Sequence, residues 1–221
     1  MKKILFSLLT ISSLAMVSCG GGEEKKEEKS ADSTAKVEEP KAPVCTYSYQ
    51  HDSTRVEWIA YKFTEKAGVK GRFDSTEVTG TGDADTMQNV FKNAAFKIYT
   101  ASTETNDKGR NEKIVKFVFG KMKSTSEITG SVKSINADGS MFTISIKMNE
   151  IEKDVEVPAT WEGEKVTLKA DINLEDWNGQ ESVKAITEAC KKNHTGTDGI
   201  TKVWPDVTII ISTTLHKTCA E

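Results

Sequence analysis

Three segments in the middle of the chain alternate between apolar and polar side chains. They lie at 141–148, 155–161 and 166–174, and in the first of them Phe142 and Ile144 are separated by Thr143. A period of two residues is typical of β-strands that have one apolar face and one solvated face. Short turns join the three segments. The sequence therefore predicts an antiparallel meander whose apolar face must be covered.

Five other segments also favour strands, and they lie at 55–63, 69–81, 94–100, 126–135 and 206–215. Helices are expected at 83–93 and 180–193, and a short helix or an irregular plug at 111–121. Eight antiparallel strands that each have one apolar face close naturally into a small barrel. The expected fold class is therefore mainly β, an eight-stranded antiparallel barrel with two or three short helices.

The N-terminus has the pattern of a secretory signal. Lys2 and Lys3 precede an apolar run at 4–16 that is short for a bilayer span, and Cys19 follows Ser18. A cysteine directly after a small residue makes residues 1–18 similar to a bacterial lipoprotein signal, which predicts lipid attachment to Cys19. On this basis we expect a protein anchored to the outer membrane of a Gram-negative bacterium, at its periplasmic face or at the cell surface. The alternative is an ordinary secretory signal in which the cysteine has no role.

The next segment, 19–43, contains glycines, a run of glutamate and lysine, and then small residues and proline. Such a composition cannot bury a core and predicts a disordered tether. Residues 44–221 are enough for one folded domain. The formal net charge is −3, and no basic stripe with interleaved aromatic residues is present, which argues against a nucleic-acid partner.

Three cysteines remain beside Cys19, and in an oxidising compartment one disulfide and one free thiol are expected. A Cys45–Cys219 pair is possible because the two ends of a closed up-and-down barrel lie together. A Cys190–Cys219 pair is equally open. We favour Cys190–Cys219, because Cys45 lies at the edge of the tether.

Residues capable of catalysis or metal binding show no convincing arrangement. His51, His194 and His216 lack metal-ligand spacing and are expected to be exposed. Four acidic residues spaced two apart could do acid–base work or hold calcium, but the opposite face of their segment is apolar, which favours a solvated outer face. These four are Glu150, Glu152, Asp154 and Glu156. No nucleophile motif or phosphate loop is present, so we expect neither an enzyme nor a cofactor nor a metal.

The apolar face of the barrel is either an ordinary packed core or a cavity for a lipid tail, and the pattern alone leaves both open. A lipid site needs few special residues, because each buried methylene contributes about 0.8 kcal/mol and a long chain binds by its length. Polar groups are needed only at the mouth. The apolar residues expected to line such a cavity are Trp58, Phe73, Phe96, Ile98, Phe142, Ile144, Ile146, Trp161 and Leu168.

Several short motifs then occur in a characteristic order. The chain reads Trp-Ile-Ala-Tyr-Lys-Phe-Thr from residue 58 and Val-Lys-Gly-Arg-Phe from residue 69. Ser-Thr-Glu-Thr from residue 102 is followed by Arg-Asn-Glu-Lys-Ile from residue 110, and Ile128-Thr-Gly, Asp176-Trp-Asn and Asp206-Val-Thr-Ile come after them. From about Arg55 to Leu215 the chain resembles the YceI-like, polyisoprenoid-binding, lipocalin-like family, whose pattern in the loop is Ser-x-Asp-Thr and then Arg-Asp-x-His-Leu.

The resemblance implies a lipocalin-like barrel that holds a long amphiphile, isoprenoid or fatty-acid-like, for sequestration or transport. Ser102, Thr105 and Arg110 match the family pattern, which makes Ser102 and Arg110 candidate ligand-binding residues. The alternative is a filled barrel that serves as a structural or protein-interaction lipoprotein. The chain departs from the pattern where head-group chemistry would lie: Asn111 stands for an aspartate, Lys113 for a histidine and Leu174 for an arginine.

Overall fold

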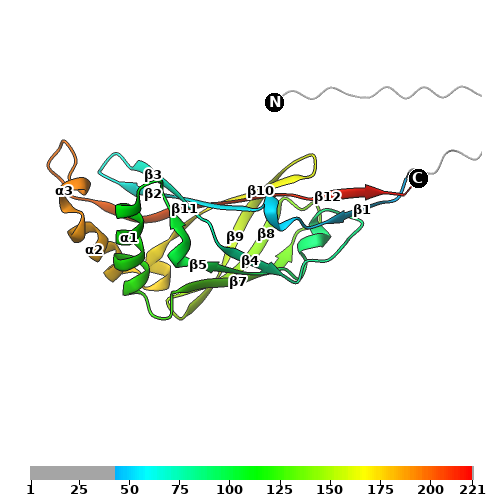
Figure 1. The fold of residues 1–221 in the computed structure, drawn as a ribbon, viewed down its shortest axis with the longest axis horizontal. Coiled ribbons are helices and arrows are strands. Elements are labelled where there is room, and N and C mark those ends of the chain that lie inside the picture. The colour runs from blue at the N-terminus through cyan, green and yellow to red at the C-terminus, as the bar shows by residue number, and fades with distance from the viewer. Residues whose placement is uncertain (1–42, 221) are drawn as a thin grey trace, which may run out of the picture. The chain divides into compact units, whose positions relative to one another are not determined.

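The computed structural model describes residues 43–220, so the predicted signal, Cys19 and almost all of the predicted tether lie outside it. Ten strands form one antiparallel sheet in the order β4-β5-β7-β8-β9-β10-β11-β2-β3-β6 (Figure 1). Their bounds are β2 (Arg55–Lys62), β3 (Ala67–Phe73), β4 (Thr76–Thr79), β5 (Ala95–Tyr99), β6 (Thr103–Glu104), β7 (Glu127–Ile135), β8 (Met141–Met148), β9 (Ile151–Glu162), β10 (Lys165–Asn173) and β11 (Val203–Thr214). The meander predicted from the alternating pattern is β8, β9 and β10.

The sheet curls into a barrel because one bent segment joins its two ends. Only Asp74 and Ser75 separate β3, which pairs with β2, from β4, which pairs with β5. At the bend, the Tyr99 N–H donates to the Ser75 carbonyl (3.2 Å) and the Asp74 N–H to the Ser102 carbonyl (3.1 Å). The predicted fold class, a mainly β lipocalin-like barrel, is confirmed, although the strand expected at 69–81 is in fact two strands with different partners.

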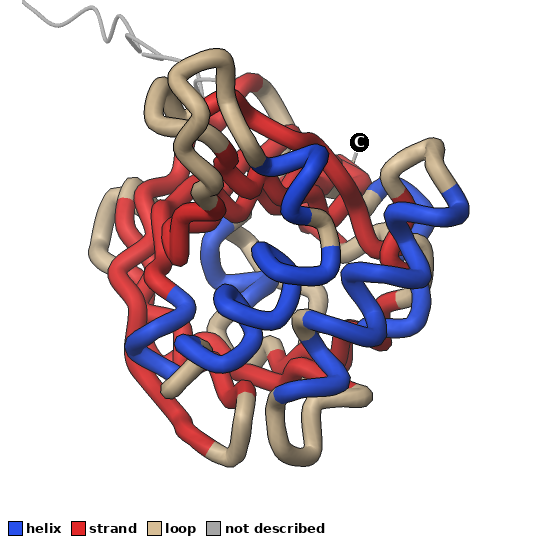
Figure 2. Tube along the Cα trace, turned by 90° about the vertical axis from the view of Figure 1, so that its left-hand side faces the viewer, coloured by secondary structure: helices blue, strands red, loops and turns tan. Residues whose placement is uncertain are grey.

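Three helices lie together at one end of the barrel. Figure 2 looks from this end and shows the strands around the periphery with the helices across the front. They are α1 (Lys108–Phe117), α2 (Gln180–Ala189) and α3 (Lys191–His194), and the 3-10 turns are η1 (His51–Ser53), η2 (Gln88–Phe91), η3 (Thr100–Ser102), η4 (Phe119–Lys121) and η5 (Leu174–Trp177). The α1 helix begins after Asp107, whose carboxylate accepts a hydrogen bond from the Arg110 N–H (3.0 Å). None of the helices between residues 43 and 220 is both long enough and apolar enough to cross a membrane.

Two predicted helices differ in detail from those observed. The helix expected at 83–93 is reduced to the single turn η2, and the one expected at 180–193 is divided into α2 and α3. The segment expected at 111–121 to be a helix or a plug is α1 followed by η4. Each predicted segment does contain helical turns, but the helices are shorter than predicted.

The first and last strands form a separate two-stranded sheet. β1 (Cys45–Ser48) pairs with β12 (His216–Cys219), and the facing residues Cys45 and Cys219 are joined by a disulfide. The favoured Cys190–Cys219 pairing is therefore wrong, and Cys190 is a free thiol. The reason is topological: Cys190 belongs to the helices at one end of the barrel, whereas β1 and β12 extend from the other end (Figure 1).

Half of the barrel interior is a packed core. Val90 and Phe91 of η2 insert at the end remote from the helices, where the ring centroids of Phe91 and Phe142 are 6.3 Å apart. Phe142, Val157 and Val166 around this insertion are each only 1% exposed. The turn η2 thus fills this half of the interior.

Candidate functional site

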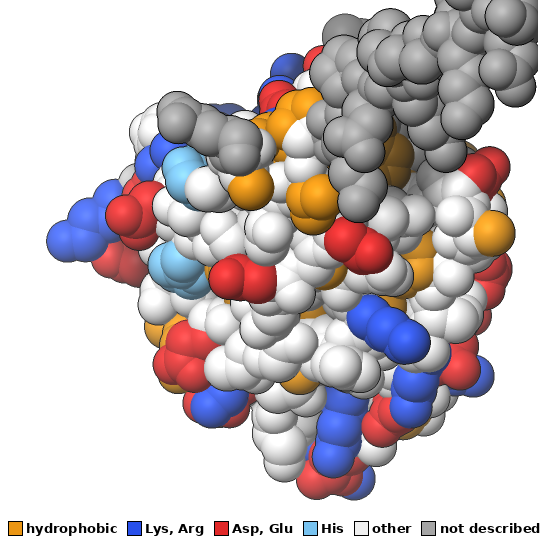
Figure 3. Space-filling view, turned by 90° about the vertical axis from the view of Figure 1, so that its right-hand side faces the viewer, with side chains coloured by type: hydrophobic (Ala, Val, Ile, Leu, Met, Phe, Trp, Pro, Cys, Tyr) orange, Lys and Arg blue, Asp and Glu red, His pale blue; other side chains and the backbone are white. Residues whose placement is uncertain are grey.

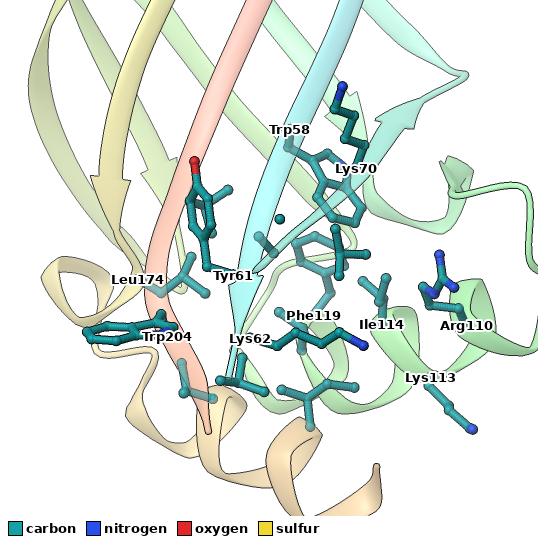
Figure 4. A pocket seen from close by; sticks show the side chains of 18 of the residues that line it. Trp58, Tyr61, Lys62, Lys70, Arg110, Lys113, Ile114, Phe119, Leu174 and Trp204 are labelled. Carbon is teal, nitrogen blue, oxygen red and sulfur yellow. The ribbon is translucent and has the colours of Figure 1, made fainter. Parts of the chain in front are cut away.

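The other half of the interior, next to the helices, is hollow. A cavity of about 880 Å³ lies there, bounded by β2, β3, β5 and β11 and by the helices α1, α2 and α3 (Figure 4). Inward-facing Val69 and Phe73 are only half-buried at this end, in contrast to the fully buried residues around η2. The volume falls in the range of sites for small molecules, which is roughly 300–1,000 Å³.

The predicted ligand-binding residues are divided between the two halves. The ones that line the cavity are Trp58, Phe73, Phe96, Ile98, Ile146 and Arg110. The apolar ones that do not line it are Phe142, Ile144, Trp161 and Leu168, which belong to the packed core or pack against it. Along β8, for example, Ile144 and Ile146 both belong to the core cluster, but only Ile146 also lines the cavity.

Two glycines keep aromatic rings against the wall of the cavity. Trp58 faces Gly71 across β2 and β3, and Phe96 faces Gly130 across β5 and β7. A β-carbon at either glycine would overlap the ring that lies over it. The absence of a side chain at these positions lets each ring lie on the barrel wall, which leaves the centre open.

Trp58 also carries an unused hydrogen-bond donor. Its side chain is 8% exposed and lines the cavity, and its indole Nε1 is buried without an acceptor among residues 43–220. A buried indole N–H usually has a partner. An oxygen atom of a molecule in the cavity can supply it.

The rim of the cavity is basic, although the whole chain has a formal net charge of −3. The charged residues around it are Lys62, Lys70, Arg110, Lys113 and Lys192 on the basic side and Glu57 and Asp107 on the acidic side. Asp107 is paired with Arg110 (3.5 Å), and the Lys62 ammonium donates to the Asn193 carbonyl (3.2 Å). Figure 4 shows Lys62 from β2 and Lys113 from α1 at this rim. At the opposite end of the domain, acidic and basic side chains are interspersed (Figure 3).

His194 belongs to this rim, so the expectation that it is exposed is wrong. It lines the cavity and is half-buried, and its Nδ1 is buried without a partner within the described part of the chain. Burial, assisted by the nearby positive charges of Lys62 and Lys113, holds the pKa of His194 below its ordinary value. His51 and His216 are exposed, as expected.

Lys62 and His194 were not predicted as site residues. For Lys62 a signal exists in the sequence, because it lies four residues after Trp58 and therefore on the same face of a strand. For His194 there is none, because its position depends on where the end of α3 lies, which the Lys62 side chain of β2 contacts at the Asn193 carbonyl.

The four acidic residues at alternate positions from 150 to 156 lie on the surface. Glu150, Glu152, Asp154 and Glu156 are all exposed. Glu152 accepts a hydrogen bond from the Ser145 hydroxyl (2.6 Å), which lowers the pKa of Glu152. Residues 43–220 contain no group of three or more potential ligands that could hold a metal ion.

The sequence profile of the YceI-like domain matches residues 47–215. The chain belongs to the YceI-like domain family. No curated protein sequence matches it significantly. The barrel is similar to the solved structure of a polyisoprenoid binding domain from Saccharophagus degradans, at 11% identity and a TM-score of 0.52, over 78% of this chain and 99% of that one.

Two further structures resemble this YceI-like domain. BcnA from Burkholderia cenocepacia is 13% identical with a TM-score of 0.49, over 77% of this chain and 99% of that one. The YCEI protein of Campylobacter jejuni is 17% identical with a TM-score of 0.48, over 72% of this chain and 90% of that one.

In this YceI-like domain, the hydroxyl groups of the family-like motif form hydrogen bonds within the protein. Ser102 lies outside the cavity: its hydroxyl donates to the Tyr99 carbonyl (2.6 Å) and accepts from the Ser75 N–H (3.0 Å), and so holds the bend that closes the barrel. The Thr105 hydroxyl donates to Asn111 Oδ1 (2.6 Å). Of the motif residues in this loop and the start of α1, Arg110, Lys113 and Ile114 line the cavity.

Proposed function

We propose that this YceI-like domain binds a long-chain amphiphile, with the tail in the hollow half of the barrel and the head at the basic rim. The observation that carries the proposal is the cavity of about 880 Å³ between Trp58, Phe73 and the helices. Burying ten methylenes of a tail there would contribute roughly 8 kcal/mol of transfer free energy, since each contributes about 0.8 kcal/mol. The ligand therefore needs length and an apolar tail more than any single contact.

The ligand class proposed is isoprenoid or fatty-acid-like. The printed description of the Saccharophagus degradans structure, a polyisoprenoid binding domain, supports this class. A filled barrel with a purely structural or interaction role is less well supported, because a packed interior would not leave the helix end hollow. The role proposed is binding for sequestration or transport, without catalysis.

The location proposed for the protein is the cell envelope. It rests on the signal-like residues 1–18 and on Cys19 as a site of lipid attachment, all of which lie outside the described residues. A tether between Cys19 and the barrel would let the barrel bind amphiphiles close to the membrane to which the chain is anchored.

A matched pair of substitutions tests the proposed function. Ala60 lines the cavity between Trp58 and Lys62, whereas Ile144 lies in the packed core. Ala60→Trp is expected to abolish binding of dodecanol and dodecanoate while changing the free energy of unfolding by less than about 1 kcal/mol. Ile144→Trp is expected to lower the free energy of unfolding by about 1–3 kcal/mol, because the core there has no spare volume. The proposal fails if the wild-type full chain binds neither amphiphile, or if the two substitutions destabilise it equally.

A further inference from the structure

The lysines of the basic rim have no acidic partner, whereas four other lysines in residues 43–220 do. Lys66 pairs with Asp206 (2.8 Å) and Lys97 with Glu127 (3.5 Å), for example. In residues 43–220, no carboxylate lies within salt-bridge distance of the four lysines of the rim, which are Lys62, Lys70, Lys113 and Lys192. The positive charge of the rim is therefore not neutralised by the described part of the protein.

Two of these lysines line the cavity from different parts of the fold. Lys62 comes from β2 and Lys113 from α1, so they approach the rim from different elements (Figure 4). Both lysines and His194 line the same cavity. Lys62 is half-buried, so its charge is less screened by water than that of an ordinary surface lysine.

The acidic groups of the rim do not offset these charges. Asp107 is already paired with the Arg110 guanidinium, and its carboxylate accepts a hydrogen bond from the Arg110 backbone N–H in the first turn of α1. Glu57 is exposed, as Lys113 is, and makes no ion pair with a rim lysine in residues 43–220. Basic residues of the rim thus outnumber the acidic ones. Positive charges in a partly desolvated site are stabilised when a negative group is brought to them, and such a group would form short, charge-assisted hydrogen bonds with the ammonium groups.

We propose that the head of the bound amphiphile is an anion, a carboxylate or a phosphate, held by Lys62 and Lys113 beside His194. This inference rests on the proposed function and adds the chemical class of the head. Trp58 lies four residues from Lys62 on the same face of β2, which is about 13 Å along a strand. A ligand with its head at Lys62 would thus extend its tail past Trp58 into the hollow half.

The test compares amphiphiles that share a tail and differ in the head. Dodecanoate and dodecyl phosphate are anionic at mildly alkaline pH, whereas dodecanol is neutral. Binding to the wild-type full chain is measured by isothermal titration calorimetry below the concentration at which each amphiphile forms micelles. At least one of the two anions is expected to bind tenfold or more tightly than dodecanol, and the ratio is expected to fall as salt is added. The preferred anion tells whether the head is a carboxylate or a phosphate.

A double variant connects the preference to the two lysines. Lys62→Gln/Lys113→Gln is expected to weaken binding of the preferred anion by tenfold or more and to leave dodecanol binding unchanged. Lys116→Gln is the control, because Lys116 is on α1 but outside the cavity, over the Phe117 ring. In the wild-type chain, bound anion is also expected to raise the pKa of His194 in an NMR titration, which bound dodecanol would not do.

The two proposals fail in different ways. Equal binding of dodecanol and both anions by the wild-type chain would overturn the anionic head and leave the cavity as a tail-binding site. Absence of binding for all three probes would overturn the proposed function itself. A loss of dodecanol affinity in the double variant as large as the loss of anion affinity would also contradict a specific role of the two lysines in the head site.

Discussion

The indole of Trp58 occupies the space that a side chain at Gly71 would need. The two residues face each other across β2 and β3, and a β-carbon at position 71 would overlap the ring. Trp58 therefore lies on the wall of the barrel, with its Nε1 buried and unpaired in the described structure, and the cavity opens beside it. This pair sets the position of the indole on the wall of the cavity.

Gly71→Ala is predicted to push the Trp58 ring toward the centre of the cavity. We expect the free energy of unfolding to fall by about 1–3 kcal/mol, the usual cost of overpacking, and the affinity for dodecanoate to fall with the lost volume. Urea unfolding and calorimetric titration measure the two effects. Gly82→Ala is the control, because nothing lies within 4 Å of a β-carbon built there. Wild-type binding and stability in Gly71→Ala would show that the pair does not shape the cavity.

The fluorescence of Trp58 is predicted to report occupancy of the hollow half. A tail beside the indole replaces water in the cavity, so emission should shift to shorter wavelength when dodecanoate is added. Trp204 also lines the cavity, so the shift is measured in a Trp204→Phe background, where Trp58→Phe is expected to remove most of it. Trp161→Phe is the matched substitution in the packed half, where Trp161 donates to the Gly139 carbonyl (2.9 Å), and it should retain the shift. If the shift depends on Trp161 instead, the ligand binds in the packed half of the barrel, which contradicts the prediction.

Removing the Cys45–Cys219 disulfide is predicted to destabilise the domain without affecting the cavity. The bond closes a loop with a sequence separation of 174, and loss of such a cross-link typically costs about 2–5 kcal/mol. The double variant Cys45→Ser/Cys219→Ser should therefore unfold at a lower urea concentration and still bind dodecanoate when folded. Cys190→Ser should leave the pairing intact in a non-reducing peptide map. Detection of a Cys190–Cys219 peptide in the wild-type protein would contradict the structure.

Acidification is predicted to destabilise the domain partly through His194. Its folded pKa lies below the ordinary value of 6.5 because of burial and of the charge on Lys62. As the pH falls, His194 takes up a proton in the unfolded chain before it does so in the folded one. The stabilising contribution of neutral His194 to the free energy of unfolding is therefore complete above about pH 6.5, and it is lost as the pH falls through the lowered folded pKa.

His194→Gln tests this by comparing unfolding free energies at about pH 7.5 and about pH 5, either side of ordinary histidine titration. The variant should lose less stability on acidification than the wild type. His51→Gln, at an exposed position, should lose as much as the wild type. Identical pH profiles for the wild type and His194→Gln would show that the folded and unfolded states protonate His194 alike.

The barrel could be predicted from sequence because strand alternation is a local property. Phe142, Ile144 and Ile146 alternate with polar residues, and each does point inward. The same alternation could not show which part of the interior is hollow. That depends on Val90 and Phe91, which are about fifty residues earlier and fill only the end remote from the helices. Alternation alone therefore predicts Trp161 and Leu168 as ligand-binding residues, whereas they pack against the core.

The polar part of the site was harder to predict from sequence. Ser102 matched a family pattern, yet its hydroxyl holds the bend between β3 and β4. A lysine at the end of a strand normally faces solvent, but Lys62 lies on the same face of β2 as Trp58 and so lines the cavity. His194 reaches the rim only through the packing of α3, a tertiary contact that no local pattern encodes.

The central claim is that the hollow half of the barrel holds an amphiphile, and native mass spectrometry of the gently purified full chain tests it most directly. The spectrum is predicted to contain a second series of peaks, heavier by the mass of one lipid-sized molecule and released at higher collision energy. This series should be lost in Ala60→Trp, which fills the cavity, and kept in Lys116→Gln. A single protein mass that acquires no adduct after incubation with dodecanoate, dodecyl phosphate or dodecanol would contradict the claim.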